Sequence, residues 1–394
     1  MRRSPLLVVY VTVFVDLLGF GIILPNLPFY ALSFGATGLW IGAILTAYSA
    51  AQLVGAPLLG RVSDAVGRRP VILLSLVGSA LSFTLTGLAD TLLLLLLARA
   101  LAGLFGGSIA AAQAYIADAT PPEDRAKHMG MLGAAIGMGF VFGPALGAAL
   151  SPLGFSAAAF CSAGLAVANF LFGVFALVEP RRARAPATGR APATSLASLL
   201  GHPYLGRLLL STFLATFAFV GMEATFALLG ERRYGLDPAG LGLVFVYVGA
   251  IVAAVQGWLV GRLASACGER GLAMTGAVVM GVALVALPLS ASLGLALAAL
   301  GALAVGQGLV TPALSSLLSR GSGADVQGST LGLGQSFAAG ARAVGPLVAG
   351  WLFDLGAPLP YLLGAALVLV VAWLVGAAGA PPTGALASEG ARDR

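Results

Sequence analysis

Residues 60–70 read GRVSDAVGRRP, a short charged stretch between two long apolar segments at about 37–60 and 69–89. Gly60 and Gly67 give the backbone the freedom that a tight turn between packed helices requires. The Asp64 carboxylate can accept hydrogen bonds from backbone N–H groups at a helix start and can pair with Arg68 and Arg69. The pattern predicts a charged turn at a membrane boundary, able to latch two parts of the molecule together.

The segments on either side belong to a chain that is apolar throughout. Of its 394 residues, 59% are hydrophobic and 9% are charged, against roughly 25% charged in a soluble domain. Runs of about 20 apolar residues cross the hydrocarbon layer as helices, and the 55 glycines suit close helix packing there. We expect twelve spans, at about 5–33, 37–60, 69–89, 91–117, 126–152, 154–178, 204–230, 238–262, 271–291, 293–319, 326–353 and 358–379.

The spans form two groups of six. We expect an N-terminal six-helix half at 1–178, a cytoplasmic linker rich in Arg, Pro, Ala and Thr at 179–203, a C-terminal half at 204–380 and a flexible cytoplasmic tail at 381–394. The Gly-Arg pair at 60–61 recurs 201 residues later at 261–262, and the Gly-Pro pair at 143–144 recurs at 345–346. Ser265 stands where the repeat of Asp64 falls. Two related halves are a common plan among transporters.

The positive charges lie on one side of this topology. All but four of the 21 Lys and Arg residues fall on segments that share a side with the N-terminus. The exceptions are Arg232 and Arg233 in an outer loop, and Arg99 and Arg342 within spans. The positive-inside rule therefore predicts a multi-pass protein of the bacterial inner (plasma) membrane with both termini cytoplasmic. The basic composition follows from this topology and does not indicate a nucleic-acid partner.

Acidic side chains within the spans are the first candidates for function. Asp16 lies some 11 residues into the first span, about 16 Å along a helix and near mid-membrane. Because an ionised carboxylate is costly there, Asp16 either couples to protons or substrate or is a structural carboxylate bonded to backbone. Glu223 is either a second proton or cation site or a carboxylate near outer water. Arg342 can pair with Glu223 or bind an anionic substrate.

The fifth span is rich in small residues and contains a proline. Gly139, Gly143 and Gly147 let this segment pack closely on a neighbour, and Pro144 kinks it. Asp118 lies in the turn that leads into this span, where we expect it to cap and clamp the cytoplasmic end.

These motifs together resemble the Major Facilitator Superfamily over essentially the whole chain. The 60–70 stretch resembles its signature between the second and third helices. Asp16 and the PNLP run at 25–28 resemble the first-helix motif of its drug/proton antiporters, and residues 137–147 resemble their antiporter signature. The turn ADATPPEDR at 117–125 resembles the tetracycline/proton antiporter branch. The resemblance implies an all-α integral membrane protein with twelve transmembrane helices in two six-helix halves.

The resemblance also implies a function and a set of site residues. It predicts a secondary active transporter, a proton-coupled antiporter that exports hydrophobic or amphipathic small molecules (multidrug or tetracycline-like) by alternating access. Arg99 resembles the family's arginine motif, with Asp16 as its hypothetical partner. The implied gating residues are Gly60, Asp64, Gly67, Arg68, Arg69, Asp118, Gly139, Gly143, Pro144 and Gly147. The implied substrate cavity contains Asn26, Gln52, Gln113, Phe219, Gln256, Gln307, Gln335 and Arg342.

The sequence also departs from the tetracycline exporters. Their acids in helices 3 and 9 and their histidine in helix 8 have no counterpart here, so the ligand stays open. A nutrient symporter or uniporter, a metabolite exporter and a lipid transporter are the alternatives on the same fold. No nucleophile–base set, metal-ligand spacing or GxxxxGK[ST] loop is visible, which argues against an enzyme or an ATP-driven pump.

The partners expected are accordingly few. They are a small-molecule substrate, protons and membrane lipid, with no cofactor because the proton gradient is the energy source. A single bundle suffices for this mechanism, so we expect a monomer.

Overall fold

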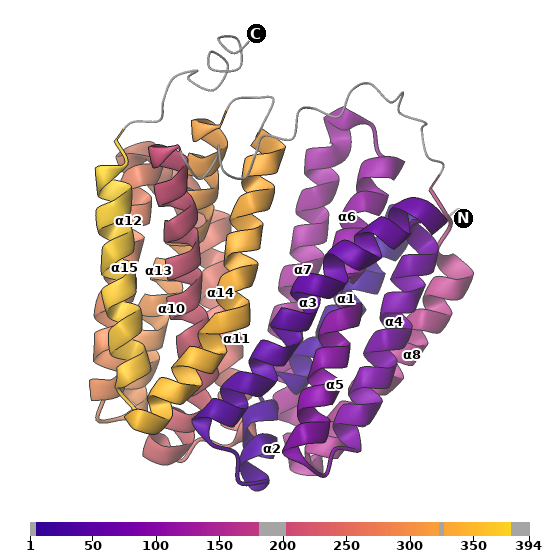
Figure 1. Cartoon of the computed structure of the whole chain (residues 1–394), viewed down its shortest axis with the longest axis horizontal. Coiled ribbons are helices and arrows are strands. Elements are labelled where there is room, and N and C mark those ends of the chain that lie inside the picture. Colours follow the sequence, from indigo (N-terminus) through magenta and orange to yellow (C-terminus); the bar gives the residue numbers. More distant parts are fainter. Residues whose placement is uncertain (1–4, 181–201, 323–326, 380–394) are drawn as a thin grey trace. The chain divides into compact units, whose positions relative to one another are not determined.

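The computed structural model describes residues 5–180, 202–322 and 327–379, and all of the regular structure in these ranges is helical (Figure 1). The predicted linker at 179–203 lies almost entirely outside the described residues, and the predicted tail at 381–394 lies wholly outside them. The described residues form two compact units.

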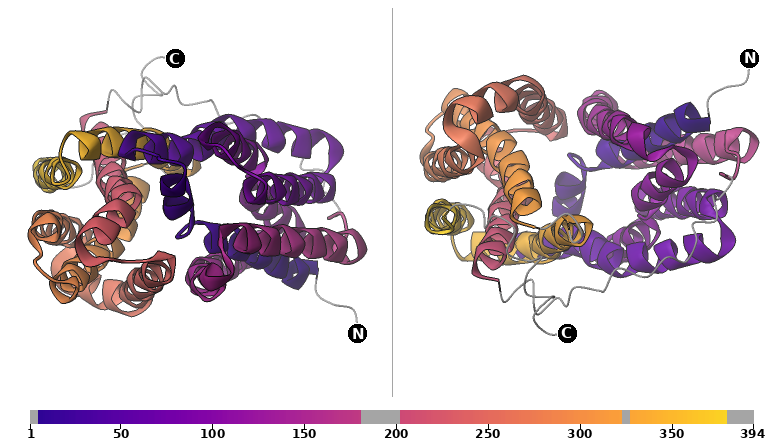
Figure 2. Two further views of the ribbon diagram at one scale, coloured as in Figure 1. Left: turned by 90° about the horizontal axis from the view of Figure 1, so that it is seen from below. Right: turned by 90° about the horizontal axis from the view of Figure 1, so that it is seen from above.

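Unit 1 contains the described residues of Met1–Pro186 together with Ala227–Tyr247. Its helices appear in indigo to magenta in Figure 1 and from both ends in Figure 2. In it α1 packs on α7 and α8, α3 packs on α5, and α4 packs on α8. The helices are α1 (Pro5–Ile23), α2 (Leu27–Ser33), α3 (Gly38–Val66), α4 (Arg68–Gly87), α5 (Leu92–Phe105), α6 (Ser108–Ala119), α7 (Pro122–Leu150) and α8 (Phe155–Ala176).

Unit 2 contains the described residues of Ala187–Phe226 and Val248–Arg394. In it α12 packs on α13 and α15, and α14 contacts both α13 and α15. The helices are α10 (Pro203–Tyr234), α11 (Pro238–Ala254) with the π-helical turn Val255–Leu259, α12 (Val260–Leu289), α13 (Leu293–Gly321), α14 (Gln327–Leu355) and α15 (Leu359–Ala377). The ends of α10 and α11 at 227–247 belong to unit 1, so the predicted halves and the compact units differ there. The boundaries of the halves stay a prediction.

Eleven stretches of the described chain are long and apolar enough to cross a membrane. One of them, Pro238–Leu289, has 52 residues, about 78 Å as a helix and far more than one crossing needs. At its Gly268 the backbone is non-helical, with φ 69°. This stretch therefore makes two crossings, which gives the twelve that the sequence predicts.

Two predicted spans are broken at positions that the sequence explains. The first span has a turn between α1 and α2 at Pro25, which lacks the N–H that a continuing helix uses. The fourth has a break at Gly106 and Gly107, between α5 and α6. The break leaves the Gly106 carbonyl to accept a hydrogen bond from Gln52 Nε2 at 3.0 Å. Both breaks lie in unit 1. The first follows α1, the helix that carries Asp16, and the second lies beside the cavity that Asp16 lines.

Candidate functional site

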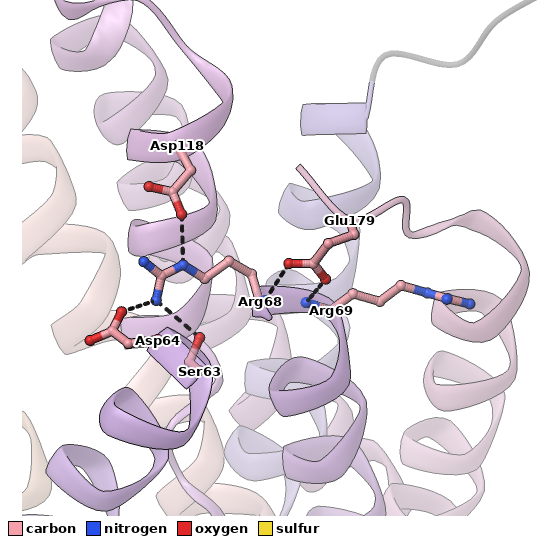
Figure 3. A network of polar contacts seen from close by, with 6 residues as sticks. All are labelled: Ser63, Asp64, Arg68, Arg69, Asp118 and Glu179. Carbon is pink, nitrogen blue, oxygen red and sulfur yellow. Dashed lines mark hydrogen bonds and ion pairs between the residues drawn. The ribbon is translucent and has the colours of Figure 1, made fainter. Parts of the chain in front are cut away.

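The charged turn at 60–70 forms a network centred on Arg68 (Figure 3). Arg68 Nε donates to Asp118 Oδ2 at 2.7 Å, and Arg68 Nη1 donates to Asp64 Oδ1 at 2.6 Å and to Ser63 Oγ at 3.1 Å. Gly67, with φ 115°, makes the sharp turn between α3 and α4. The guanidinium therefore ties the ends of α3 and α6 to the start of α4 through charge-assisted hydrogen bonds.

The start of α4 is capped by a residue that sequence reasoning missed. Glu179 accepts from the backbone N–H of Arg68 at 2.6 Å and from that of Arg69 at 2.9 Å (Figure 3). Asp64 lies in the last turn of α3, and the ion pair with Arg68 that the sequence predicts for it is formed. An acid directly after the sixth span, followed by Pro180, was the available signal.

Unit 2 repeats part of this network with its charges exchanged. Glu269 occupies the position 201 residues after Arg68, and Arg320 the position 202 residues after Asp118. Arg320 Nη2 lies 2.7 Å from Glu269 Oε1, and Ser316 Oγ donates to the same oxygen at 3.0 Å. Both networks thus join the third and fourth spans of their unit, but the acid and the base have changed places.

The arginine one residue further on has the same role in both units. Arg69 Nη2 donates to the carbonyl of Val174 at 2.7 Å, at the end of α8. Arg270 Nη2 donates to the carbonyl of Gly376 at the end of α15, again 202 residues later. Each guanidinium satisfies a carbonyl that has no partner within its own helix. The sequence repeat therefore corresponds to recurring contacts.

Asp16 lies in a small polar cavity within unit 1. Its Oδ1 accepts from Ser79 Oγ of α4 at 3.0 Å, and its Oδ2 accepts from Ser108 Oγ of α6 at 2.6 Å. The cavity has a volume of about 30 Å³, enough for a water molecule. Tyr48 and Gln52 also line it. Both carboxylate oxygens thus have hydroxyl donors from other helices, and the alternative of a carboxylate bonded to backbone is not what the structure shows.

Arg99 is buried away from this carboxylate. Its side chain is 1% exposed, and its guanidinium lies 4.8 Å from the ring centre of Tyr48 and 5.3 Å from that of Phe20. Its Nε and Nη1 have no hydrogen-bond partner among the described residues. The hypothetical ion pair between Arg99 and Asp16 is not formed, because two serines hold the acid and two aromatic faces hold the base.

The glycines of α7 bring this helix against α1. A Cβ at Gly143 would lie 2.6 Å from Gly21 Cα, and one at Gly139 would lie 2.7 Å from Leu17 Cβ. A Cβ at Gly147 would lie 2.5 Å from the carbonyl oxygen of Ile22. These spacings of four residues place one face of α7 in contact with α1, the close packing that the sequence predicts for the fifth span.

Unit 2 contains a larger cavity of about 540 Å³ between α10, α13 and α14. Five residues that the sequence singled out line it together, namely Phe219, Glu223, Gln307, Gln335 and Arg342. Glu223 is half-buried, and the charge of Arg342 acts on it. The Oε1 atom of Gln307 is buried without a hydrogen-bond partner in the described part of the chain. The cavity combines one acid, one base and neutral polar groups with an apolar wall.

Three predicted cavity residues lie elsewhere. Asn26 is 3% exposed, and its Nδ2 donates to the carbonyls of Ile22 at 2.9 Å and Gly147 at 3.2 Å, so its amide joins α7 to the end of α1. Gln113 on α6 and Gln256 in the π-helical turn are exposed, and neither lines the two cavities described above. For Gln113 and Gln256 the role in a substrate cavity stays a prediction.

Comparisons with known proteins find related membrane transport and drug resistance proteins that align over most of this chain. Residues 9–346 match the model of the Major Facilitator Superfamily. The tetracycline resistance protein, class C, of Escherichia coli is 31% identical and aligns over 93% of this chain and 95% of its own. Multidrug resistance protein 2 of Bacillus subtilis (strain 168) is 27% identical over 94% of each chain. The crystal structure of the human organic anion transporter MFSD10 (TETRAN) superposes with a TM-score of 0.69 at 28% identity, covering 95% of this chain and 99% of that one.

Proposed function

The chain belongs to the Major Facilitator Superfamily and is a secondary active transporter of the membrane, and on this premise we propose that it exports hydrophobic or amphipathic small molecules in exchange for protons. The proposal places it in the bacterial inner membrane with both termini cytoplasmic. The names of its relatives, tetracycline and multidrug resistance proteins, support drug efflux.

The observation that carries the proposal is the cavity that Glu223 shares with Phe219 and the polar groups of α13 and α14. A carboxylate within a span is stable when it carries a proton, pairs or meets water. Proton and ligand then compete for Glu223. When the ligand leaves, a proton neutralises the acid, and the two halves can expose the cavity to the other side of the membrane.

Asp16 supplies a second candidate for coupling. Its two serine donors stabilise the charged form, and they come from α4 and α6. A shift of either helix breaks one of these hydrogen bonds and favours proton uptake. We propose that Asp16 links the proton to the helix arrangement within unit 1, whereas Glu223 links it to the ligand. Arg99, fixed between Phe20 and Tyr48, adds a permanent positive charge to unit 1.

The test is transport into sealed proteoliposomes with an imposed pH gradient. We expect accumulation of lipophilic drugs that depends on the gradient and is lost in Glu223→Gln and reduced in Asp16→Asn. Asp237→Asn is the matched control, because Asp237 caps α11 outside the spans through Gly240 N at 2.7 Å, and an amide oxygen can keep that hydrogen bond. If drug uptake by the wild-type protein is the same with and without the pH gradient, proton coupling is contradicted.

A second candidate function, transport of organic anions, is favoured by one observation. Arg342 lines the same cavity as Glu223, and the chain is similar to a human organic anion transporter of known structure. A guanidinium recognises carboxylates through paired N–H groups. In the same vesicles, uptake of an organic anion that Arg342→Gln abolishes would favour this alternative.

A further inference from the structure

Among the described residues that line the cavity of unit 2, two carry opposite charges, Glu223 on α10 and Arg342 on α14. With both groups ionised, the charges of the lining sum to zero. A ligand with a single charge that binds beside one of these groups shares the cavity with the other, which has the same sign as the ligand. In a cavity of low dielectric the repulsion between these like charges is costly.

Several neutral polar groups of the cavity can accept hydrogen bonds. Gln307 Oε1 is buried with no donor among the described residues. The hydroxyls of Thr212 and Ser315 donate to the carbonyls of Leu208 at 2.9 Å and Thr311 at 3.0 Å. Each of these hydroxyl oxygens keeps lone pairs that can accept a hydrogen bond. A ligand that donates several hydrogen bonds satisfies these groups, whereas one without donors leaves Gln307 Oε1 unpaired.

Apolar side chains also line the cavity, and they favour a ligand with an apolar scaffold. Phe219, Val310, Leu314, Leu318 and Leu331 line the cavity. Its volume of about 540 Å³ is within the range of sites for drug-sized molecules. An apolar scaffold fits this wall, and its charged ends then face α10 and α14.

We propose that the cavity binds amphoteric molecules, with a protonated amine facing Glu223, an anionic group facing Arg342 and further N–H donors facing Gln307. This inference rests on the proposed function for its relevance to export. In this proposal Glu223 and Arg342 determine specificity, because each binds the oppositely charged group at one end of the same ligand. It also explains how a proton displaces the ligand, since protonation of Glu223 removes the partner of the ammonium and leaves Arg342 as the net charge.

The experiment measures binding to the full-length protein in detergent, with no gradient present. The probes are a fluoroquinolone with a basic piperazine, a tetracycline and an aminopenicillin, each in three forms: amphoteric, acylated or otherwise blocked at the amine, and blocked at the acid. For at least one scaffold we expect the wild-type protein to bind the amphoteric form about tenfold more tightly than either blocked form, about 1.4 kcal/mol.

The variants should change the order of affinities, not only weaken binding. Glu223→Gln should prefer the amine-blocked anion, and Arg342→Gln should prefer the acid-blocked cation. Glu223→Asp and Arg342→Lys should keep the wild-type order, which separates charge recognition from misfolding. Glu231→Gln and Arg233→Gln, in the last turn of α10 and outside the cavity lining, are the matched controls and should bind as the wild type does.

Two results overturn the proposal. One is a wild-type protein that binds none of the amphoteric probes more tightly than both of their blocked forms, including one that binds none at all. The other is the same order of affinities in the wild type and in both glutamine variants. Failure of proton-driven uptake alongside a switch in charge preference would instead refute the export mechanism and leave the ligand class intact.

Discussion

The close approach of α1 and α7 gives a direct prediction for Gly143. A Cβ at this position would lie 2.6 Å from Gly21 Cα and 3.0 Å from the carbonyl oxygen of Leu18. Both atoms are backbone, so no side-chain rotation relieves the contact and the two helices must separate. We expect overpacking to cost Gly143→Ala about 1–3 kcal/mol, a ratio of folded to unfolded protein roughly 5- to 150-fold lower than in an alanine variant of the same helix that lacks this contact.

Gly137→Ala is the matched control on the same helix. A Cβ at Gly137 meets no atom within 4 Å. Both substitutions gain the same helix propensity, about 1 kcal/mol, so the difference between the two variants isolates the contact with α1. The assay is reversible unfolding in mixed micelles titrated with SDS, monitored by circular dichroism. Equal midpoints for the two variants, or a higher midpoint for Gly143→Ala, would refute the packing argument.

Three further outcomes follow from the charged and aromatic contacts. Glu179→Gln should lower stability by about 1 kcal/mol, because the charged cap of α4 becomes neutral, and the SDS midpoint measures this loss. The single changes Glu269→Arg and Arg320→Glu should each impair transport by placing like charges together, whereas the double exchange should restore it; a double variant as poor as either single one contradicts a role for the pair. Tyr48→Leu should destabilise the protein by about 1–2 kcal/mol, since it removes an aromatic face from the buried Arg99, and a midpoint equal to the wild type's would rule that contact out.

The helices were predictable from the sequence because their length is set by the bilayer. The tenth span, expected at about 293–319, is Leu293–Gly321, and Ser292 caps its start through Leu295 N. The second span was expected to end at 60 but continues to Val66. Its last turn is charged, and hydropathy alone cannot distinguish a charged helix end from a loop.

The contacts of the site were less predictable, since they depend on residues far apart in the chain. Five cavity residues of unit 2 were identified as candidates by their type, but their convergence at α10, α13 and α14 is a property of packing. Glu179 lies 111 residues from the backbone N–H of Arg68 that it caps. The pairing of Arg99 with Asp16 was a hypothesis by analogy with the family, whereas the fold provides aromatic faces for Arg99 and hydroxyls for Asp16.

Proton release on ligand binding tests the central claim most directly. The purified protein, in detergent and a weak buffer near neutral pH, is mixed with lipophilic and amphoteric drugs while a pH dye is recorded. Competition at Glu223 predicts that a bound drug releases a proton from the wild-type protein and releases none from Glu223→Gln. Drug binding with no proton release from the wild type, or with equal release from Glu223→Gln, would contradict exchange at this carboxylate.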